Sequence, residues 1–356
     1  MAEVHETNIR VQQVPRSRLP EVDLKNISFG TIFTDHMFQA DSVEGSWTDL
    51  QLLPYGPVQF NPALMALHYG QAIFEGMKAF RTVDNEVVLF RPRANFERFN
   101  ISAERMCMPV TTEEVFMEGL FRLIDMDRDW VPGFDNSSLY VRPFMYATDQ
   151  FLGVRPSHTY RFAIICSPAG AYYSKPLRVK IEKHYTRSAK GGIGYAKAAA
   201  NYGLSLLPTK LAQEAGFDQI IWTDAVNHEY VEEAGTANFM FVIDGTLVTP
   251  PVKDTILKGI TRDSIVTLVR SWGMEVQERE VAVSELVEAM EKGRLQEAFA
   301  VGTAATVTHI SEIGHEDRVY RLPAVEKREL APRILETLND IRYGRAEDPF
   351  GWMVKV

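Results

Sequence analysis

Apolar residues along the chain follow two different periods. Short runs rich in aromatic and β-branched residues predict strands at residues 86–90, 139–142 and 160–166. Residues 177–182 alternate between apolar and polar positions, as a half-buried strand does. Residues 91–106 carry Phe96, Phe99, Ile101 and Met106 among the apolar positions of a predicted helix.

The second half of the chain continues this mixture. Residues 239–243 and 246–249 flank Asp244-Gly245, a dipeptide typical of a tight hairpin turn. A helix is predicted over 260–272, with Thr261 able to cap its start and Gly273 to end it. Another helical pattern covers 201–215, and Pro208 is expected to kink or interrupt it.

A chain of 356 residues is too long for one average hydrophobic core, so two domains are expected. Small residues and two prolines at 167–176 indicate a connector between them. The predicted organisation is α+β, with a small N-terminal α/β domain at 1–166 and an interdomain loop at 167–176. A larger α/β domain would then cover 177–356.

Charge and cysteine content narrow the class of protein. A net charge of -9 argues against a nucleic-acid binder or a protein that docks on anionic lipid. Cys107 and Cys166 lie far apart, so neither a disulfide framework nor a zinc site is expected. The first residues have neither signal-peptide nor transit-peptide character, and no apolar run approaches the ~20 residues that span a bilayer. We expect a cytoplasmic protein.

Lys197 is the first candidate for chemistry. It lies among small residues in Gly-Tyr-Ala-Lys-Ala-Ala-Ala-Asn-Tyr-Gly, where a bulky group can approach its amine. Loss of hydration lowers the pKa of a lysine and makes it a better nucleophile towards an aldehyde. The alternative is a surface lysine at the start of an alanine-rich helix.

Two glycine-containing segments are candidate phosphate sites. A glycine turn precedes the predicted helix at Ile260 and Thr261, and helix starts present backbone N–H groups and a favourable dipole to anions. The turn at Thr303 and Ala304 can direct its amides at an anion. Taken alone, a segment like the first is more often a simple helix cap, and one like the second is more often just a turn.

Charged side chains supply further candidates. A carboxylate at residue 232 or 233 can hold a proton on a pyridine nitrogen, but Glu232 and Glu233 are adjacent, so their side chains point to opposite faces of a strand. Arg98 on the predicted helix and Arg142 at a strand end offer planar donors suited to phosphate or carboxylate.

These segments occur in one order, and with them the chain resembles the branched-chain aminotransferases of fold type IV, pyridoxal-phosphate enzymes of transaminase class IV. The resemblance runs from Phe-Gly-Thr-Ile-Phe-Thr-Asp-His-Met at 29–37 to Ile-Arg-Tyr-Gly at 341–344. It includes Phe-Glu-Gly-Met-Lys-Ala-Phe within 67–81 and Ala-Val-Gly-Thr-Ala within 295–304. It implies a two-domain fold with pyridoxal 5'-phosphate between the domains, and a homodimer.

The resemblance also implies a role for individual residues. Lys197 matches the lysine that bonds to the cofactor and moves the substrate proton, and Tyr202 matches the tyrosine at the phenolic oxygen. Glu233, with Arg187 nearby, matches the partner of the pyridine nitrogen, which selects it over Glu232. The cofactor phosphate is expected to be bound by Arg98, Ile260, Thr261 and Thr303.

For the substrate, the resemblance implies binding of the α-carboxylate by the amides of Thr303 and Ala304. It implies an apolar pocket for leucine, isoleucine or valine side chains, matched here by Phe29, Tyr69, Phe74, Tyr140 and Tyr172. Arg142, with Tyr69, matches the group that receives the γ-carboxylate of glutamate. The expected reaction converts branched-chain L-amino acids and 2-oxoglutarate into branched-chain 2-oxo acids and L-glutamate by a ping-pong mechanism.

Other readings of the sequence stay open at this stage. D-amino-acid aminotransferases and aminodeoxychorismate lyases share the cofactor residues and differ in the substrate pocket. A non-catalytic phosphate-binding protein would use the helix start at Ile260 but has no use for Lys197. The chain departs from the animal branch of the family where a Cys-x-x-Cys pair follows the Gly-Thr-Ala turn, because Ala305 and Thr308 stand there.

Overall fold

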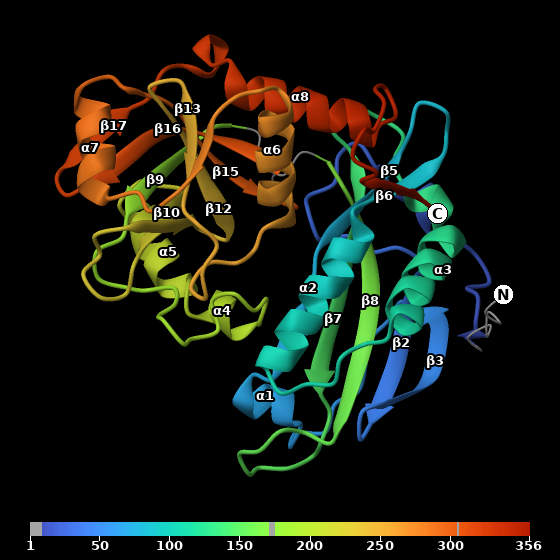
Figure 1. Ribbon diagram of the computed structural model, residues 1–356. Coiled ribbons are helices and arrows are strands. Elements are labelled where there is room, and N and C mark those ends of the chain that lie inside the picture. Colours follow the sequence, from blue (N-terminus) through green and yellow to red (C-terminus); the bar gives the residue numbers. More distant parts are fainter. Residues whose placement is uncertain (1–8, 171–174, 305) are drawn as a thin grey trace. The chain divides into compact units, whose positions relative to one another are not determined.

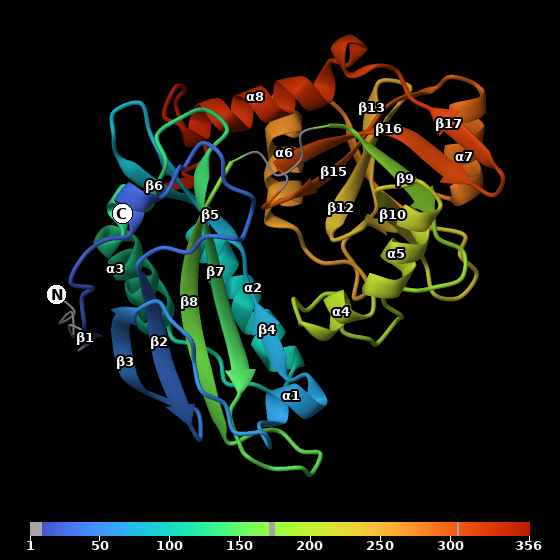
Figure 2. The same cartoon turned by 180° about the vertical axis from the view of Figure 1, so that it is seen from behind.

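The chain divides into two compact units. Unit 1 comprises Met1–Tyr172 with Asp340–Val356, and unit 2 comprises Tyr173–Asn339. The computed structural model describes residues 9–170, 175–304 and 306–356, and Figures 1 and 2 show it from opposite sides. Residues 340–356, expected with the second domain, group with unit 1.

Unit 1 is built on one sheet with the strand order β1-β3-β2-β8-β7-β5-β6-β18, and β4 pairs with β7 beside this path. Its strands are β1 (Arg10–Val11), β2 (His36–Val43), β3 (Ser46–Pro54), β4 (Ala72–Phe74), β5 (Met77–Arg81), β6 (Val87–Phe90), β7 (Ser138–Ala147), β8 (Thr159–Ala169) and β18 (Met353–Lys355). The grouping of 340–356 follows from β18, which pairs antiparallel with β6.

Helices α2 and α3 cover one face of this sheet (Figures 1 and 2). The helical segments of unit 1 are η1 (Leu19–Glu21), α1 (Met65–Tyr69), α2 (Pro92–Arg105), the π-helix η2 (Glu114–Glu118), α3 (Gly119–Met126) and η3 (Arg128–Trp130). Beneath them the fully buried rings of Phe99 and Phe116 pack on Phe162, with centroids 5.3 and 5.5 Å away. This aromatic contact joins helix and sheet into one core.

Strand β8 is longer than the sequence pattern predicts. It continues to Ala169, into the segment expected as a connector, because Ser167, Pro168 and Ala169 still pair with β7. Pairing of β8 with β2 ends at Ile164. Pro168 therefore lies where β8 has lost one neighbour and a missing N–H is tolerated.

In unit 2 the strands are β9 (Leu177–Ile181), β10 (Gln219–Thr223), β11 (Val231–Ala234), β12 (Ala237–Ile243), β13 (Thr246–Thr249), β14 (Val276–Glu278), β15 (Leu295–Gly302), β16 (Thr306–His315) and β17 (Arg318–Arg321). Their order is β11-β10-β9-β16-β15-β12-β13-β14, with β17 beside β16. Because β11 also pairs with β12, the strands from β11 to β12 close into a ring.

The core of unit 2 lies against these strands and includes Val179, Phe239, Phe241, Ile313 and Leu286. Its helical segments are α4 (Ala200–Gly203), α5 (Leu206–Glu214), α6 (Ile260–Ser271), α7 (Val283–Glu291), η4 (Val325–Lys327) and α8 (Leu330–Arg342), whose last residues belong to unit 1. The predicted hairpin is confirmed, since Asp244 and Gly245 both have positive φ, at 49° and 78°.

The predicted 201–215 helix is interrupted, but the break lies before Pro208 and not at it. The segment is split into α4 and α5 at Leu204 and Ser205, and Pro208 is the third residue of α5. In that first turn a backbone N–H has no acceptor within its own helix, so proline costs nothing there. Within the described ranges, no helix is long and apolar enough to cross a membrane.

Candidate active site

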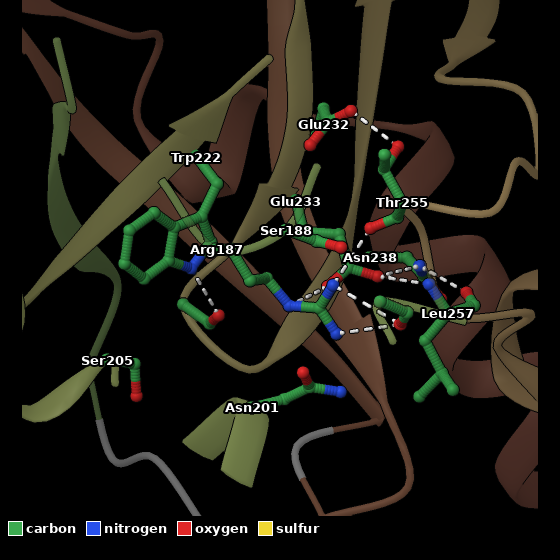
Figure 3. Close-up of polar contacts among 12 residues, drawn as sticks. Arg187, Ser188, Asn201, Ser205, Trp222, Glu232, Glu233, Asn238, Thr255 and Leu257 are labelled. Carbon is green, nitrogen blue, oxygen red and sulfur yellow. Dashed lines mark hydrogen bonds and ion pairs between the residues drawn. The ribbon is translucent and has the colours of Figure 1, made fainter. Parts of the chain in front are cut away.

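The centre of the candidate site is a buried ion pair in unit 2 (Figure 3). Arg187 Nε lies 2.7 Å from Glu233 Oε2, and the two side chains are 6% and 3% exposed. Glu233 Oε1 also accepts hydrogen bonds from Asn238 Nδ2 at 3.0 Å and from the Leu257 amide at 2.9 Å. Three donors therefore hold the carboxylate in one orientation.

The local fold explains why Asn238 reaches Glu233. Strands β11 and β12 are joined by a two-residue turn, and the register places Glu233 opposite Asn238. Gly235 in this turn has φ 56°, and its carbonyl accepts a hydrogen bond from the buried indole of Trp222 at 2.8 Å. Gly259 leaves the room Asn238 needs, because a Cβ there would lie 1.8 Å from Asn238 Oδ1.

Backbone carbonyls accept hydrogen bonds from both Nη atoms of Arg187. Its Nη1 donates to the Thr255 carbonyl at 2.9 Å, and both Nη atoms lie 3.3–3.4 Å from the Gly194 carbonyl. The guanidinium is thus held by two loops and by the strand that carries Glu233 (Figure 3). These contacts fix the direction in which the guanidinium faces Glu233.

Lys197 and Tyr202 lie together beside the start of α4. Lys197 Nζ donates to Tyr202 Oη at 2.8 Å, and the amine lies 5.3 Å from the centroid of that ring. Ala196 and Ala198 on either side are 1% and 0% exposed, so the backbone around the half-buried lysine is anchored in the protein. The structure therefore places the amine and the phenol in direct contact.

The two candidate phosphate segments have different structures. Helix α6 begins at Ile260 after an extended Gly259, so Thr261 is the second residue of the helix and not its cap. No side chain of the described residues caps this helix start. Thr303 and Ala304 form the turn that follows β15. Amides of a helix's first turn have no acceptor within the helix, which is the condition for binding an anion.

Arg98 makes a buried ion pair of its own in unit 1. Its Nε and Nη2 lie 2.7 and 2.9 Å from the two oxygens of Glu75, whose side chain is fully buried. Asn95 Nδ2 donates to the same carboxylate at 2.7 Å. A bidentate pair of this kind fixes the plane and direction of the guanidinium.

Four of the predicted pocket residues gather in unit 1. The ring of Phe29 packs edge-on against Tyr140 at 4.9 Å, and Arg142 lies over Phe74 at 4.6 Å and donates to Tyr140 Oη at 2.9 Å. Arg142 Nε is buried without a hydrogen-bond partner among the described residues. Tyr69 ends α1 and donates to the Leu152 carbonyl. Tyr172 lies outside the described residues.

Several residues that hold the candidate site together were not predicted from the sequence. Asn238 and Thr255 hold the Glu233–Arg187 pair, and Glu75 holds Arg98. A two-residue turn at Gly235-Thr236 would have identified Asn238, because it places that residue opposite Glu233. Glu75 and Thr255 reach their partners only through tertiary contacts.

A directed amine, a phenol and a buried carboxylate form the set of groups expected of an enzyme that transfers groups through a nucleophilic lysine. The profile of the amino-transferase class IV family matches residues 72–313. The chain belongs to this family.

Within this family, the chain is similar to proteins named as branched-chain-amino-acid aminotransferases. The chain is 43% identical over 352 residues, 98% of its length and 97% of the relative's, to branched-chain-amino-acid aminotransferase 2 of Bacillus subtilis (strain 168). It is 44% identical over 339 residues, 94% of both chains, to a probable branched-chain-amino-acid aminotransferase of Staphylococcus epidermidis. The resemblance inferred from the motifs is confirmed.

Solved structures of branched-chain amino acid aminotransferases have a fold similar to that of this chain. The branched-chain amino acid aminotransferase of Escherichia coli has a TM-score of 0.73 at 27% identity, covering 90% of this chain and 98% of that one. The branched-chain amino acid aminotransferase of Thermobaculum terrenum, in its PLP-form, has a TM-score of 0.73 at 24% identity, covering 90% and 98%. The predicted fold class, α+β of fold type IV, is confirmed.

Replacing Arg187 with alanine should destabilise the protein without any cofactor present. The change leaves Glu233 buried and without its counter-charge, which costs about 3–5 kcal/mol in comparable buried pairs. Urea unfolding of the cofactor-free protein measures this loss.

The matched control is Arg318→Ala, which breaks the exposed pair with Glu291, 73% and 46% exposed. Exposed pairs contribute roughly 0–1 kcal/mol. Equal losses in the two variants would contradict the assignment of a stabilising buried pair.

Proposed function

We propose that the protein is a pyridoxal-phosphate-dependent branched-chain-amino-acid aminotransferase. It exchanges the amino group between leucine, isoleucine or valine and 2-oxoglutarate, forming branched-chain 2-oxo acids and L-glutamate. The observation that carries the proposal is similarity over nearly the whole chain to relatives with this name, at 43% and 44% identity. The arrangement around Glu233 and Lys197 supports it.

The residues present fit the chemistry of the cofactor. A buried carboxylate held by three donors suits a protonated ring nitrogen. An amine in contact with a phenol suits an aldehyde and its neighbouring hydroxyl. We assign the ring nitrogen to Glu233 with Arg187, the aldehyde to Lys197 and the phenolic oxygen to Tyr202. The phosphate is assigned to Arg98, Ile260, Thr261 and Thr303.

When bound, pyridoxal phosphate stores the amino group and accepts the electron pair released at the α-carbon of the substrate. Lys197 Nζ would hold the cofactor aldehyde and, as a free amine, would carry a proton between the α-carbon of the substrate and the aldehyde carbon of the cofactor. Tyr202 Oη orients the amine through their 2.8 Å contact. Glu233 keeps a proton on the ring nitrogen. Storage of the amino group gives ping-pong kinetics.

Substrate recognition is assigned to two groups of residues. The turn amides of Thr303 and Ala304 receive the α-carboxylate. The aromatic side chains of Phe29, Tyr69, Phe74, Tyr140 and Tyr172 receive the branched side chain, and each buried methylene contributes about 0.8 kcal/mol. Arg142, whose Nε is buried without a partner among the described residues, receives the γ-carboxylate of glutamate.

The proposed protein is a homodimer that acts in the cytoplasm. Support for a dimer comes from large apolar side chains at the surface, with Leu152 65% and Leu206 71% exposed. Support for a reducing compartment comes from the two cysteines, since Cys107 and Cys166 are both free thiols. No specific observation favours a D-amino-acid aminotransferase or an aminodeoxychorismate lyase.

Purified protein with pyridoxal phosphate, L-leucine and 2-oxoglutarate should yield 4-methyl-2-oxopentanoate and L-glutamate. The aromatic pocket provides the reason, because it stabilises a branched apolar side chain. Chromatography of the products measures the reaction. Turnover of D-alanine or aminodeoxychorismate without turnover of L-leucine would overturn the assignment.

Arg142→Met should separate the two half-reactions. The change removes the charge for the γ-carboxylate and keeps an unbranched apolar chain over Phe74. The kcat/KM for 2-oxoglutarate is expected to fall at least roughly 30-fold, because losing one partner of a buried charge pair costs about 2 kcal/mol or more.

Single-turnover absorbance measurements with each substrate test this. The leucine half-reaction is the internal control and should change by less than about threefold, since it needs no charge at Arg142. An equal fall for both substrates would contradict the assigned role.

A further inference from the structure

Glu232 is the buried carboxylate next to Glu233 to which the proposed mechanism gives no part. It is 4% exposed, as deeply buried as its neighbour at 2%. Its Oε1 accepts a hydrogen bond from Thr255 Oγ1 at 2.6 Å, while Oε2 has no hydrogen-bond partner among the described residues. A buried carboxylate oxygen without a donor is costly, so its presence calls for a compensating role.

A short chain of contacts connects Glu232 with the cofactor carboxylate. The Thr255 hydroxyl donates to Glu232, and the carbonyl of the same residue accepts from Arg187 Nη1 at 2.9 Å. Arg187 in turn pairs with Glu233 at 2.7 Å. Figure 3 shows Thr255 between Glu232 and the guanidinium. Through this residue Glu232 influences both the position and the electrostatic surroundings of Arg187.

Without a charge on Glu232, the site has no excess negative charge to offset a protonated ring nitrogen. Arg187 and Glu233 together are neutral, and a neutral pair holds a proton on a neighbouring nitrogen less strongly than a net negative site. With Glu232 ionised, this part of the protein holds two carboxylates and one guanidinium, and the excess negative charge matches one protonated ring nitrogen. Lys253 is the other nearby cation, and it forms an ion pair with Glu280.

In the protein alone, the surroundings of Glu232 raise the pKa of its carboxyl group. Burial raises the pKa of Glu232, and adjacent Glu233 adds to the rise, while the Thr255 hydrogen bond and the charges of Lys253 and Arg187 oppose it. A positive charge arriving at Glu233 shifts the balance towards ionised Glu232. By linkage, ionised Glu232 favours the proton on the ring nitrogen to the same extent.

We propose that Glu232 is a positioning residue that balances the charge of Arg187 and so leaves the negative charge of Glu233 to the ring nitrogen of the cofactor. The inference rests on the proposed pyridoxal-phosphate function. Glu232 is then a second carboxylate that affects protonation of the ring nitrogen. It acts through Thr255 and Arg187 and does not touch the ring.

The experiment compares holoenzymes loaded with pyridoxal phosphate that carries ¹⁵N at the ring nitrogen. Glu232→Gln removes the charge, and its amide oxygen still accepts from Thr255. Glu232→Asp restores the charge. Glu229→Gln is the matched control, since Glu229 is exposed and lies three residues earlier on the same segment. The ¹⁵N chemical shift reports protonation directly, and absorbance reports cofactor occupancy.

At neutral pH the wild type, E232D and E229Q should show the shift of a protonated ring nitrogen. E232Q should move towards the unprotonated value, and its kcat/KM for leucine should fall roughly tenfold, the effect of about one pKa unit of lost coupling. If E232Q does not fold, Thr255→Val decides, because it removes the hydroxyl that stabilises ionised Glu232 and should shift the signal in the same direction.

An E232Q holoenzyme with the same ¹⁵N shift as E229Q would overturn the inference, as would an unchanged shift in T255V where E232Q does not fold. Failure of the underlying function looks different. In that case the wild type itself takes up no pyridoxal phosphate and shows no ring-nitrogen signal.

Discussion

Burial of opposite charges at Glu233 and Arg187 is the constraint on which the site of unit 2 depends. An isolated buried charge costs several kcal/mol, so each partner requires the other and both require fixed hydrogen bonds. Asn238, Leu257, Thr255 and Gly194 supply those bonds, and they come from one strand and two loops. The fold thereby positions a buried carboxylate through contacts from separate segments of the chain.

The ring of strands in unit 2 makes this arrangement possible. Closure through β11 and β12 brings Glu233 opposite Asn238, and Trp222 from β10 holds the connecting turn. Helix α6 starts close along the chain to Leu257, whose amide binds Glu233. The segment from Thr255 to Thr261 therefore connects the Glu233–Arg187 pair with the start of α6.

Local sequence predicts much of this and misses what depends on tertiary contact. The hairpin at Asp244-Gly245, the helix at 260–272 and the strand-rich α+β fold follow from turn chemistry and periodicity. The family resemblance, carried by the order of the motifs, assigned the pyridine nitrogen to Glu233 and not to Glu232. Residue spacing showed only that the two side chains point to opposite faces of a strand. Spacing does not show that Glu232 is buried or that it accepts a hydrogen bond from Thr255, 23 residues away. The grouping of 340–356 with unit 1 depends on the pairing of β18 with β6.

The proposed function requires that Lys197 bonds to pyridoxal phosphate. Borohydride reduction of the yellow holoenzyme, followed by mass spectrometry of its peptides, tests it most directly. The yellow band should disappear, and a single phosphopyridoxyl group should be found on the peptide that contains Lys197. A modified lysine elsewhere in the chain, with Lys197 unmodified, would contradict it.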